Sequence, residues 1–424
     1  MRLRPANHLS ADFWKFFTGQ VISNFGTSFT AFALPLLVYR LTGSSVNLAI
    51  AAVSEFLPYL LFGLVIGAWV DRTNRKRLMI AANLVMSVLF GSIPALYAFG
   101  HLSLLWIYVV GFLGSTTFIA FNSAEYAALP SLVPSDDLVT ANGRIDASYQ
   151  AASIIGPVVA GALAAVIAIP NLLAVDACSY VVAAISLLLV RGSFNQETNI
   201  DRSLTTIRQD IVEGLRYVIG HPVLRNISLM MAMVNFVGAS AGYQLVLFAS
   251  RQLHVTGPQL GALYSASAAG IVVFGLLAGW FRKRWSFSIV ALGALMVSGL
   301  LTVVFAFNPF YWVSLPLWAA IGGLGLMFNI NTRSLRQQIV PNHMLGRVMS
   351  IAGVLAWSAI PVGTLLGGFA IKLSGNVVLV YAAIGVLTFL IPLCFAFSPL
   401  GHTEDYMPGE TEPAEGSEQE LQAV

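Results

Sequence analysis

The sequence predicts an all-α membrane protein with twelve transmembrane helices. Its 424 residues are 57% hydrophobic and only 10% charged, whereas soluble domains average about 25% charged residues. Twelve apolar runs are each long enough for a bilayer crossing, which takes about 20 residues in a helix. One water-soluble core cannot bury so much apolar side chain, so the folded chain is solvated by lipid.

The predicted spans form two sets of six. The first set covers roughly residues 16–39, 46–70, 78–99, 103–128, 144–168 and 172–190, and the second 224–249, 259–281, 286–307, 311–331, 347–371 and 377–397. The last residues carry seven of the 19 acidic side chains among Pro, Gly and Ser, a composition typical of disorder. The predicted domains are an N-terminal half (1–190), a cytoplasmic linker (191–223), a C-terminal half (224–397) and an acidic cytoplasmic tail (398–424).

Basic residues orient the chain. With the N-terminus inside, 19 of the 22 Lys and Arg residues fall in inner segments, and only Arg40, Arg251 and Lys372 fall outside. Inner loops of membrane proteins carry an excess of these residues. We therefore expect both termini in the cytoplasm and the chain in the inner (plasma) membrane of the cell.

Short matches between the two sets indicate an internal duplication. The matching segments lie 207 to 212 residues apart and keep the same order. They are Asn24-Phe25 with Asn235-Phe236, Phe62-Gly63-Leu64 with Phe274-Gly275-Leu276, and Phe121-Asn122 with Phe328-Asn329. Two parallel six-helix halves are one of the transporter architectures, with a substrate site at the midplane between them.

The loop after the second run combines glycine, acidic and basic residues. It reads Gly67-x-x-x-Asp71-Arg72-x-x-Arg75-Lys76. Glycine permits close helix packing, and the basic cluster suits the cytoplasmic surface. Basic residues that only set the topology would need neither the aspartate nor the glycine.

This loop resembles the signature loop of the major facilitator superfamily, with Asn74 in place of a usual glycine. The resemblance implies a cytoplasmic gate formed by Gly67, Asp71, Arg72, Arg75 and Lys76. Further segments are similar to the macrolide and siderophore (enterobactin) exporters of that superfamily. These segments are Thr42-Gly43-Ser44-Ser45, Leu57-Pro58, residues 130–134 with Ala141-Asn142, residues 213–217 and His221-Pro222.

The fifth run carries Gly156, Pro157 and Gly161. Proline and glycine in a helix predict a bend or a tight contact. The segment also resembles the superfamily's antiporter motif, with Ala160 in place of a glycine, and ordinary helix packing is the alternative. The arginine that many drug–proton antiporters carry in helix 4 is absent, since the segment there contains Gly111 and Gly114.

Acidic residues in the spans belong to the N-terminal half alone. Ionisable groups in lipid are costly and mark ion or substrate pathways. Glu55 lies nine residues into the second run and is the first candidate for carrying a proton or pairing with a cationic substrate; a neutral structural role is the alternative. Glu125 and Asp176 are further coupling candidates, with pairing to the basic loop and a structural role as their alternatives. For Asp146 we expect a structural role in the first turn of its helix.

Several polar and aromatic residues are candidates for lining the substrate cavity. Asparagines inside a span are expected to face the bundle interior, and aromatic side chains line hydrophobic ligand sites. The candidates are Asn24, Tyr59, Tyr149, Asn235, Tyr243 and Trp357. In the linker, Leu204, Ile207, Ile211, Leu215 and Val218 repeat at helical spacing, which predicts an amphipathic helix on the inner membrane surface.

These features predict a secondary transporter that works by alternating access. We expect this chain to transport a small-molecule substrate, with protons as the coupling ion. We also expect it to lie in the lipid bilayer as a monomer and to have no nucleic acid partner. We expect no cofactor and no metal, because the two cysteines are far apart, the histidines lie in loops or tails and no nucleotide-binding loop occurs. Resemblance points to proton-coupled export of a bulky amphipathic compound: a drug, macrolide or siderophore. A lipid or lysolipid flippase is the alternative, and a membrane-embedded enzyme is disfavoured because no catalytic cluster is present.

Overall fold

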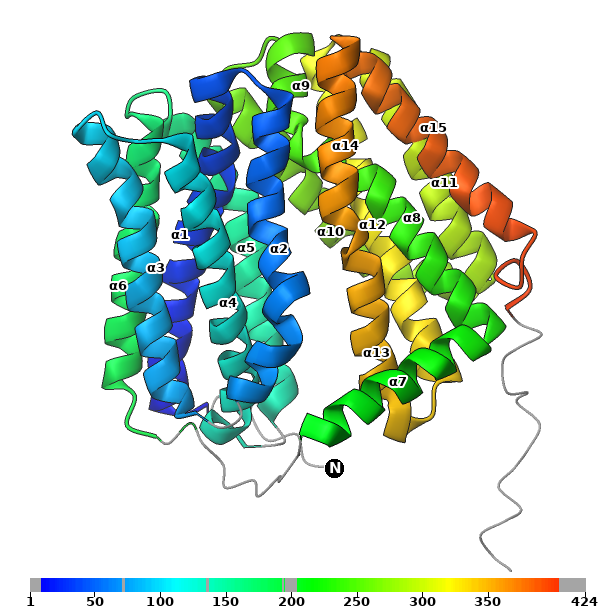
Figure 1. The fold of residues 1–424 in the computed structure, drawn as a ribbon, viewed down its shortest axis with the longest axis horizontal. Helices are drawn as coiled ribbons and strands as arrows, with labels where there is room; N and C mark the ends of the chain where they lie inside the picture. Colours follow the sequence, from blue (N-terminus) through cyan, green and yellow to red (C-terminus); the bar gives the residue numbers. More distant parts are fainter. Residues whose placement is uncertain (1–8, 71–72, 135–136, 193, 195–203, 404–424) are drawn as a thin grey trace, which may run out of the picture.

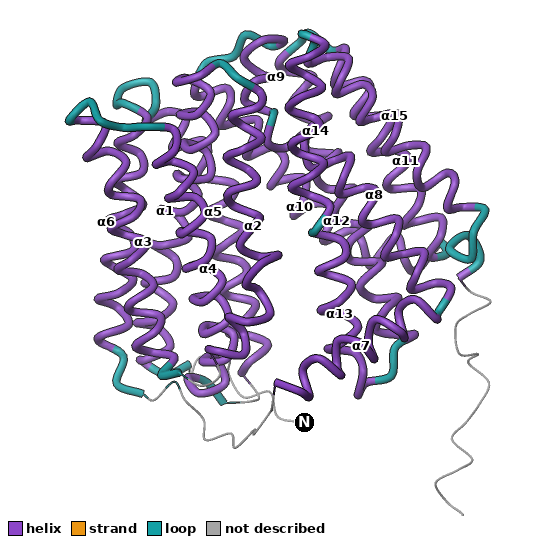
Figure 2. Tube along the Cα trace, in the orientation of Figure 1, coloured by secondary structure: helices purple, strands orange, loops and turns teal. Residues whose placement is uncertain are grey.

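The protein is a bundle of long helices (Figures 1 and 2). The computed structural model describes residues 9–70, 73–134, 137–192, 194 and 204–403. The first half contains α1 (Ala11–Thr42), α2 (Ser45–Val70), α3 (Arg75–Ala98), α4 (Leu104–Leu132), α5 (Leu138–Leu163) and α6 (Ile169–Leu189). The linker helix α7 (Leu204–Gly220) is followed by α8 (Pro222–Tyr243), α9 (Leu245–Gln252), α10 (Gly257–Arg284), α11 (Phe287–Phe307), α12 (Tyr311–Ile339), α13 (Asn342–Trp357), α14 (Ala359–Ser374) and α15 (Val377–Ala396).

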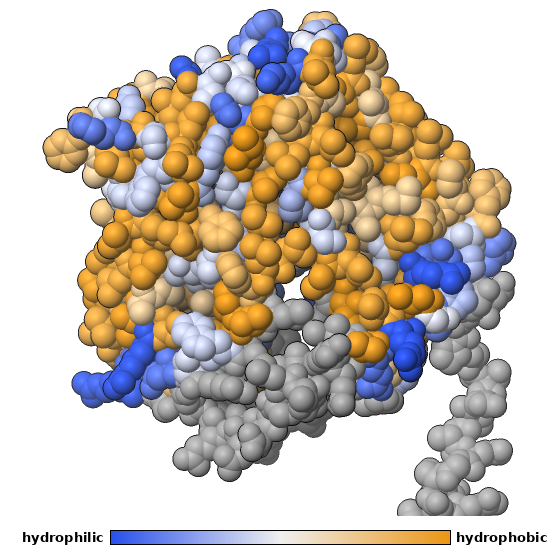
Figure 3. All heavy atoms as spheres, viewed as in Figure 1, coloured by the Kyte–Doolittle hydropathy of each residue, from blue (hydrophilic) through white to orange (hydrophobic). Residues whose placement is uncertain are grey.

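The helices are suited to lipid. Among the described residues, 11 helical segments are long and apolar enough to cross a membrane. Large apolar side chains such as Leu276 and Val88 point outward, and apolar residues cover most of the visible face, with hydrophilic residues gathered toward its ends (Figure 3). Helix α5, whose first half contains Asn142, Arg144 and Asp146, is not among the 11. The predicted all-α membrane fold is confirmed, and with α5 added to the 11 segments the described helices are consistent with the predicted twelve spans.

Several predicted boundaries are wrong. Helix α5 begins at Leu138 rather than 144, and α12 continues to Ile339 rather than 331. Helices of membrane proteins extend into water where apolar runs stop, since the backbone hydrogen bonds within a helix are independent of its surroundings. Asp146 is therefore two turns into α5 and not in its first turn.

Two predicted spans are each divided into two helices. The span near 347–371 is broken between α13 and α14, because Pro361 has no N–H to donate to the carbonyl of Trp357 four residues earlier. The span near 224–249 is broken at Gln244 between α8 and α9. Both breaks lie on helices that face the other half, since α14 packs against α2, and α8 also contacts α2.

The two halves use the same packing scheme. In the first half α1 packs on α5 and α6, and α4 packs on α2 and α3; in the second, α8 packs on α14 and α15, and α12 packs on α10 and α11. The duplicated asparagines occupy matching places. Asn24 Nδ2 donates to Ser148 Oγ of α5 at 3.0 Å, and Asn235 Nδ2 donates to the Ala356 carbonyl of α13 at 2.9 Å. The predicted pseudo-symmetry of the two halves is confirmed.

The halves are joined at one end of the bundle, here named the closed end, which carries Gly43, Ser45, Gly161 and Gly257. The main contacts between halves are α5 with α10 and α2 with α14. Of the buried apolar clusters among the described residues, the one that reaches this end contains side chains of both halves, including Phe32, Phe248 and Tyr381. The clusters toward the opposite end each belong to a single half.

Hydrogen bonds reinforce the closed end. Ser45 Oγ of α2 donates to the Gly368 carbonyl of α14 at 2.8 Å, and Gln244 Nε2 donates to the Ser45 carbonyl at 2.7 Å. Arg251 donates to the Gly43 carbonyl at 3.2 Å. Between described residues, no such bond joins the halves at the opposite end.

The linker helix α7 lies across the opposite end of the second half (Figure 1). Its Leu215 and Val218 pack with Met344 and Val348 of α13. This part of the apolar face therefore contacts protein, and the location of α7 on the inner membrane surface stays a prediction. The side chains of Leu204, Ile207 and Ile211, like the tail beyond 403, lie outside the described residues.

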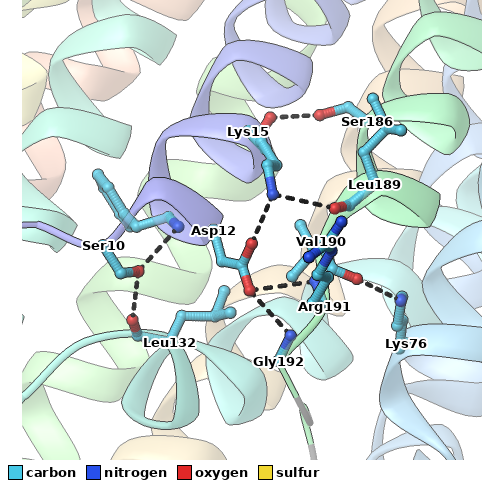
Figure 4. A network of polar contacts seen from close by, with 11 residues as sticks. Ser10, Asp12, Lys15, Lys76, Leu132, Ser186, Leu189, Val190, Arg191 and Gly192 are labelled. Atoms are coloured by element: carbon cyan, nitrogen blue, oxygen red, sulfur yellow. Dashed lines mark hydrogen bonds and ion pairs between the residues drawn. The ribbon is translucent and has the colours of Figure 1, made fainter.

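A polar network fixes the start of α1 to the end of α6 (Figure 4). Asp12 Oδ2 accepts from the backbone N–H groups of Arg191 at 3.0 Å and Gly192 at 2.9 Å, and Asp12 Oδ1 accepts from Lys15 Nζ at 2.8 Å. Lys15 also donates to the Leu189 carbonyl at 3.1 Å. One carboxylate thus satisfies two N–H groups that follow the last turn of α6.

Asp12→Ala is expected to destabilise the first half. Hydrogen bonds to a charged group contribute about 1.5–3 kcal/mol each when buried, and this partly exposed site should lose about 1–2 kcal/mol. The measurement is the midpoint of thermal unfolding in detergent. Asp137→Ala is the matched control, because Asp137 precedes α5 without a side-chain capping bond. Equal melting midpoints for the two variants would contradict the assigned role of Asp12.

Candidate functional site

A cavity of about 570 Å³ lies inside the first half. Pockets for drug-sized ligands measure about 300–1,000 Å³. Helices α1 to α6 all contribute to its lining. The lining residues include Gln20, Asn24, Thr27, Thr30, Glu55, Asn83, Met86, Phe90, Gly111, Gly114, Phe121, Glu125, Asn142, Asp146, Tyr149 and Tyr180.

The lining of this cavity is acidic and aromatic. Glu55, Glu125 and Asp146 contribute carboxyl groups, and no Lys, Arg or His is among the described lining residues. Asp146 and Tyr149 are exposed to solvent, so the cavity is open beside the first turns of α5. An anionic space with aromatic walls suits an amphipathic cation, which gains from both carboxylates and ring faces.

Glu55 reaches the cavity from the middle of α2. Its side chain lies against α4, where a Cβ placed on Gly111 would be 3.7 Å from Glu55 Cγ. No hydrogen bond or ion pair joins Glu55 to another described residue. The carboxyl group is therefore available to a proton or to a ligand.

Glu125 lies in the same cavity, on α4. Its Oε1 accepts a hydrogen bond from Gln20 Nε2 of α1 at 2.7 Å. Within the described chain Glu125 forms no ion pair, and Lys76 of the basic loop donates to the Val190 carbonyl at 2.6 Å instead. Pairing with the basic loop is not seen between described residues, and the coupling role of Glu125 stays a prediction.

Asp176 is fully buried behind the cavity, between α6 and α1. It accepts hydrogen bonds from Thr30 Oγ1 at 2.5 Å and from Ser179 Oγ at 3.2 Å. A Cβ on Gly26 would lie 2.7 Å from Asp176 Oδ1, so the helices approach closely here. Because Asp176 is not part of the cavity lining and is satisfied by two hydroxyl groups, its geometry favours helix packing.

The predicted cavity residues divide into two groups. Asn24 and Tyr149 line the cavity. Tyr59, Tyr243 and Trp357 form an aromatic cluster with Phe56 that crosses between halves; ring centroids are 5.9 Å apart for Phe56 and Tyr243 and 6.1 Å apart for Tyr59 and Trp357. This cluster and Asn235 lie outside the lining of the cavity, at the interface of α2 with α8 and α13.

The Gly-Pro segment of α5 packs on two other helices. A Cβ on Gly156 would overlap Ser28 Oγ of α1, and a Cβ on Gly161 would lie 2.6 Å from the Gly257 carbonyl oxygen of α10. A Cβ on Gly261 would overlap the carbonyl oxygen of Pro157. The segment is therefore the point of closest approach between α5 and α10 at the closed end.

The described part of the gate motif contacts its own half. Arg75 donates to the carbonyls of Ala127 at 3.0 Å and Phe194 at 3.4 Å, which ties α3 to α4 and to the end of α6. Gly67 lies in the last turns of α2. Asp71 and Arg72 lie outside the described residues, so their predicted gate contacts stay a prediction.

Sequence reasoning missed three features of the site. Gln20 and Asn83 are polar residues inside apolar runs, and this signal could have identified them. In the sequence, Gly111 and Gly114 mark only the absence of an arginine, whereas in the structure both line the cavity. Small residues at these positions leave the space that the cavity occupies.

Comparison with known proteins identifies the family. The sequence model of the family described as transmembrane secretion effector matches residues 7–422. The chain belongs to this family of the major facilitator superfamily. Macrolide efflux protein A of Streptococcus pyogenes is 26% identical over 380 residues, which cover 87% of this chain and 92% of that protein. The multidrug efflux pump Tap of Mycolicibacterium fortuitum is 27% identical over 354 residues, covering 81% and 85%.

A solved structure supports the same fold. The bacterial homologue of the human lysosomal transporter Spinster, in an inward-facing and unoccupied conformation, superposes with a TM-score of 0.74 at 13% identity. The match covers 96% of this chain and 100% of that chain. Sequence and structure thus agree on a multi-pass membrane transporter of the major facilitator superfamily with efflux proteins among its relatives.

Gly161→Leu is expected to open the closed end of this transporter. Overpacking costs about 1–3 kcal/mol, which changes a two-state ratio by about 5- to 150-fold. After replacement of the two native cysteines, spin labels at Leu41 and Leu373 would report the separation of the halves by pulsed electron resonance, and a longer distance should appear.

Gly143→Leu is the matched control on the same helix, because no atom lies within 4 Å of a Cβ at Gly143. Identical distance distributions for Gly161→Leu and Gly143→Leu would show that the α5–α10 contact does not hold the halves together.

Proposed function

We propose that this protein exports a bulky amphipathic small molecule, a drug, macrolide or siderophore, in exchange for protons. The observation that carries the proposal is the cavity in the first half, where Glu55 and Glu125 meet aromatic side chains. The efflux relatives support the direction of transport. Protons are the coupling ion because the cavity offers carboxyl groups and no basic side chain among its described lining residues.

Exchange follows from competition for one carboxyl group. A carboxyl group binds either a proton or the cationic part of a substrate, and each favours release of the other. Glu55 is the first choice for this group, since no described residue pairs with it. Glu125 is the second, and its bond to Gln20 holds one of its oxygens in place.

Alternating access requires the contacts between the halves at the closed end to break and form again. In the predicted orientation both termini are cytoplasmic, so the closed end faces outward and the cavity is accessible from inside. The contacts of α5 with α10 and of α2 with α14 would separate when the outer side opens. The loop with Asp71 and Arg72 would then close the inner side, as the superfamily resemblance implies.

Glu55→Gln is expected to uncouple transport from the proton gradient. In inverted membrane vesicles with an acidic interior, the wild-type protein should accumulate dyes and macrolides, and the glutamine variant should only equilibrate them, because it cannot release a proton. Uptake is measured with and without the gradient. Asp137→Asn, which removes a carboxylate outside the cavity lining, is the matched control and should behave as wild type.

The other outcomes assign the carrier elsewhere. Full coupling in Glu55→Gln would move the role to Glu125, tested as Glu125→Gln, with Asp176→Asn as a third variant. If no dye, macrolide or siderophore moves under any gradient but a fluorescent lysolipid crosses the bilayer, export by proton exchange is refuted and the flippase function replaces it.

A further inference from the structure

One side chain in the cavity is buried and unpaired. Asn83 of α3 is 1% exposed, and both Nδ2 and Oδ1 lack a hydrogen-bond partner among the described residues. Within the described chain, it is the one buried unpartnered group that also lines the cavity. A buried amide without partners has lost its bonds to water and gained nothing in return.

Three other polar residues of the cavity, Asn24, Gln20 and Thr27, differ from Asn83 in having partners. Asn24 donates to Ser148, Gln20 donates to Glu125, and Thr27 Oγ1 lies 3.0 Å from Tyr180 Oη. These bonds join α1 to α5, α4 and α6 and thus hold the bundle together. Asn83 joins nothing, so helix packing does not account for an amide at this position.

The surroundings of Asn83 form a small site with a polar and an apolar part. Asn83, Met86 and Phe90 lie at positions i, i+3 and i+7 of α3 and all line the cavity. Phe90 reaches toward α4, where a Cβ on Gly114 would be 3.1 Å from its Cζ. Glycine at 114 therefore leaves room for the ring beside the amide.

The charge of the cavity that Asn83 and Glu125 both line determines the class of ligand. Glu125 uses Oε1 for the bond from Gln20, and its Oε2 has no hydrogen-bond partner in the described chain. No basic side chain is among the described lining residues. A protonated amine can donate to the free carboxylate oxygen, while an amide offers two donors and an acceptor to a hydroxyl or amide next to that amine.

We propose that Asn83, with the Gln20–Glu125 pair, forms a subsite that binds the protonated amine and the adjoining hydroxyl or amide of an amphipathic amine. The inference rests on the proposed export function and names the substrate class that this cavity selects. A ligand with hydrogen-bonding atoms supplies the partners that the Asn83 amide lacks. A cation without hydrogen-bonding atoms would bind to the carboxylates and rings but gain nothing from Asn83.

The test measures binding to the purified full-length protein in lipid nanodiscs by calorimetry at fixed pH. The probes are propranolol, an aryl amino alcohol, and tetraphenylphosphonium, a cation with no hydrogen-bonding group. For Asn83→Leu we expect propranolol to bind about tenfold more weakly, the effect of one lost hydrogen bond, and tetraphenylphosphonium to bind within about twofold of wild type. Glu125→Gln should weaken both.

Two controls separate binding from folding. Asn329→Leu removes an amide outside the cavity lining, one that donates to the Gly325 carbonyl at 3.0 Å, and it should leave the preference for propranolol unchanged. The melting temperature of Asn83→Leu should stay equal or rise, because replacing an unpaired buried polar group by an apolar one relieves its desolvation. A structural asparagine would give a lower melting temperature.

The binding and melting measurements together can refute the proposed subsite. The subsite is refuted if Asn83→Leu binds propranolol as wild type does, if both cations weaken equally, or if the variant melts at a lower temperature. It is also refuted, together with the proposed substrate class, if the wild-type protein binds neither cation. Normal binding in a protein that shows no gradient-driven uptake would refute proton exchange and leave the subsite intact.

Discussion

Lipid offers no hydrogen bonds, and this constraint decides most of the structure. Every backbone group in the bilayer must find its partner within a helix, and every polar side chain must turn inward to another helix. The bonds of Asn24 to Ser148 and of Asn235 to Ala356 are two such solutions, repeated in the two halves. Asn83 is informative because it breaks this rule inside a cavity, where a ligand or water can replace the missing helix partner.

The same constraint shapes how the halves meet. Side chains in lipid gain little by burial against each other, so helices associate where small residues allow close backbone contact. Gly161, Gly257 and Gly261 provide such a contact between α5 and α10, and Ser45 with Gly368 provides one between α2 and α14. Among the described residues such contacts gather at the closed end, where one apolar cluster is shared, whereas the clusters toward the opposite end each belong to a single half. That division permits the halves to rotate as rigid units.

The chemistry is distributed unequally over a symmetric frame. Duplication supplied two halves with equivalent packing, yet the acidic residues of the spans lie in the first half alone. The described cavity is accordingly lined by this half, with Glu55 and Glu125 on neighbouring helices. The second half contributes to closure through α10 and α14 and to the aromatic cluster through Tyr243 and Trp357. The carboxyl groups of the spans therefore lie in one half, whereas the contacts that close the bundle involve both.

Hydropathy, basic residues and repeated segments determined the fold class, the two-half architecture and the acidic residues worth testing, because each is a local property of the chain. Helix ends and breaks were harder to predict from the sequence. Leu138 begins α5 before the apolar run starts, and Pro361 divides an apolar run that is continuous in the sequence. Only the tertiary structure separated Glu55 and Glu125, which share a cavity, from Asp176, which two hydroxyl groups satisfy behind it. It alone showed Asn83 without a partner, because the pairing of a polar group depends on residues that are distant in the chain and adjacent only after the helices pack.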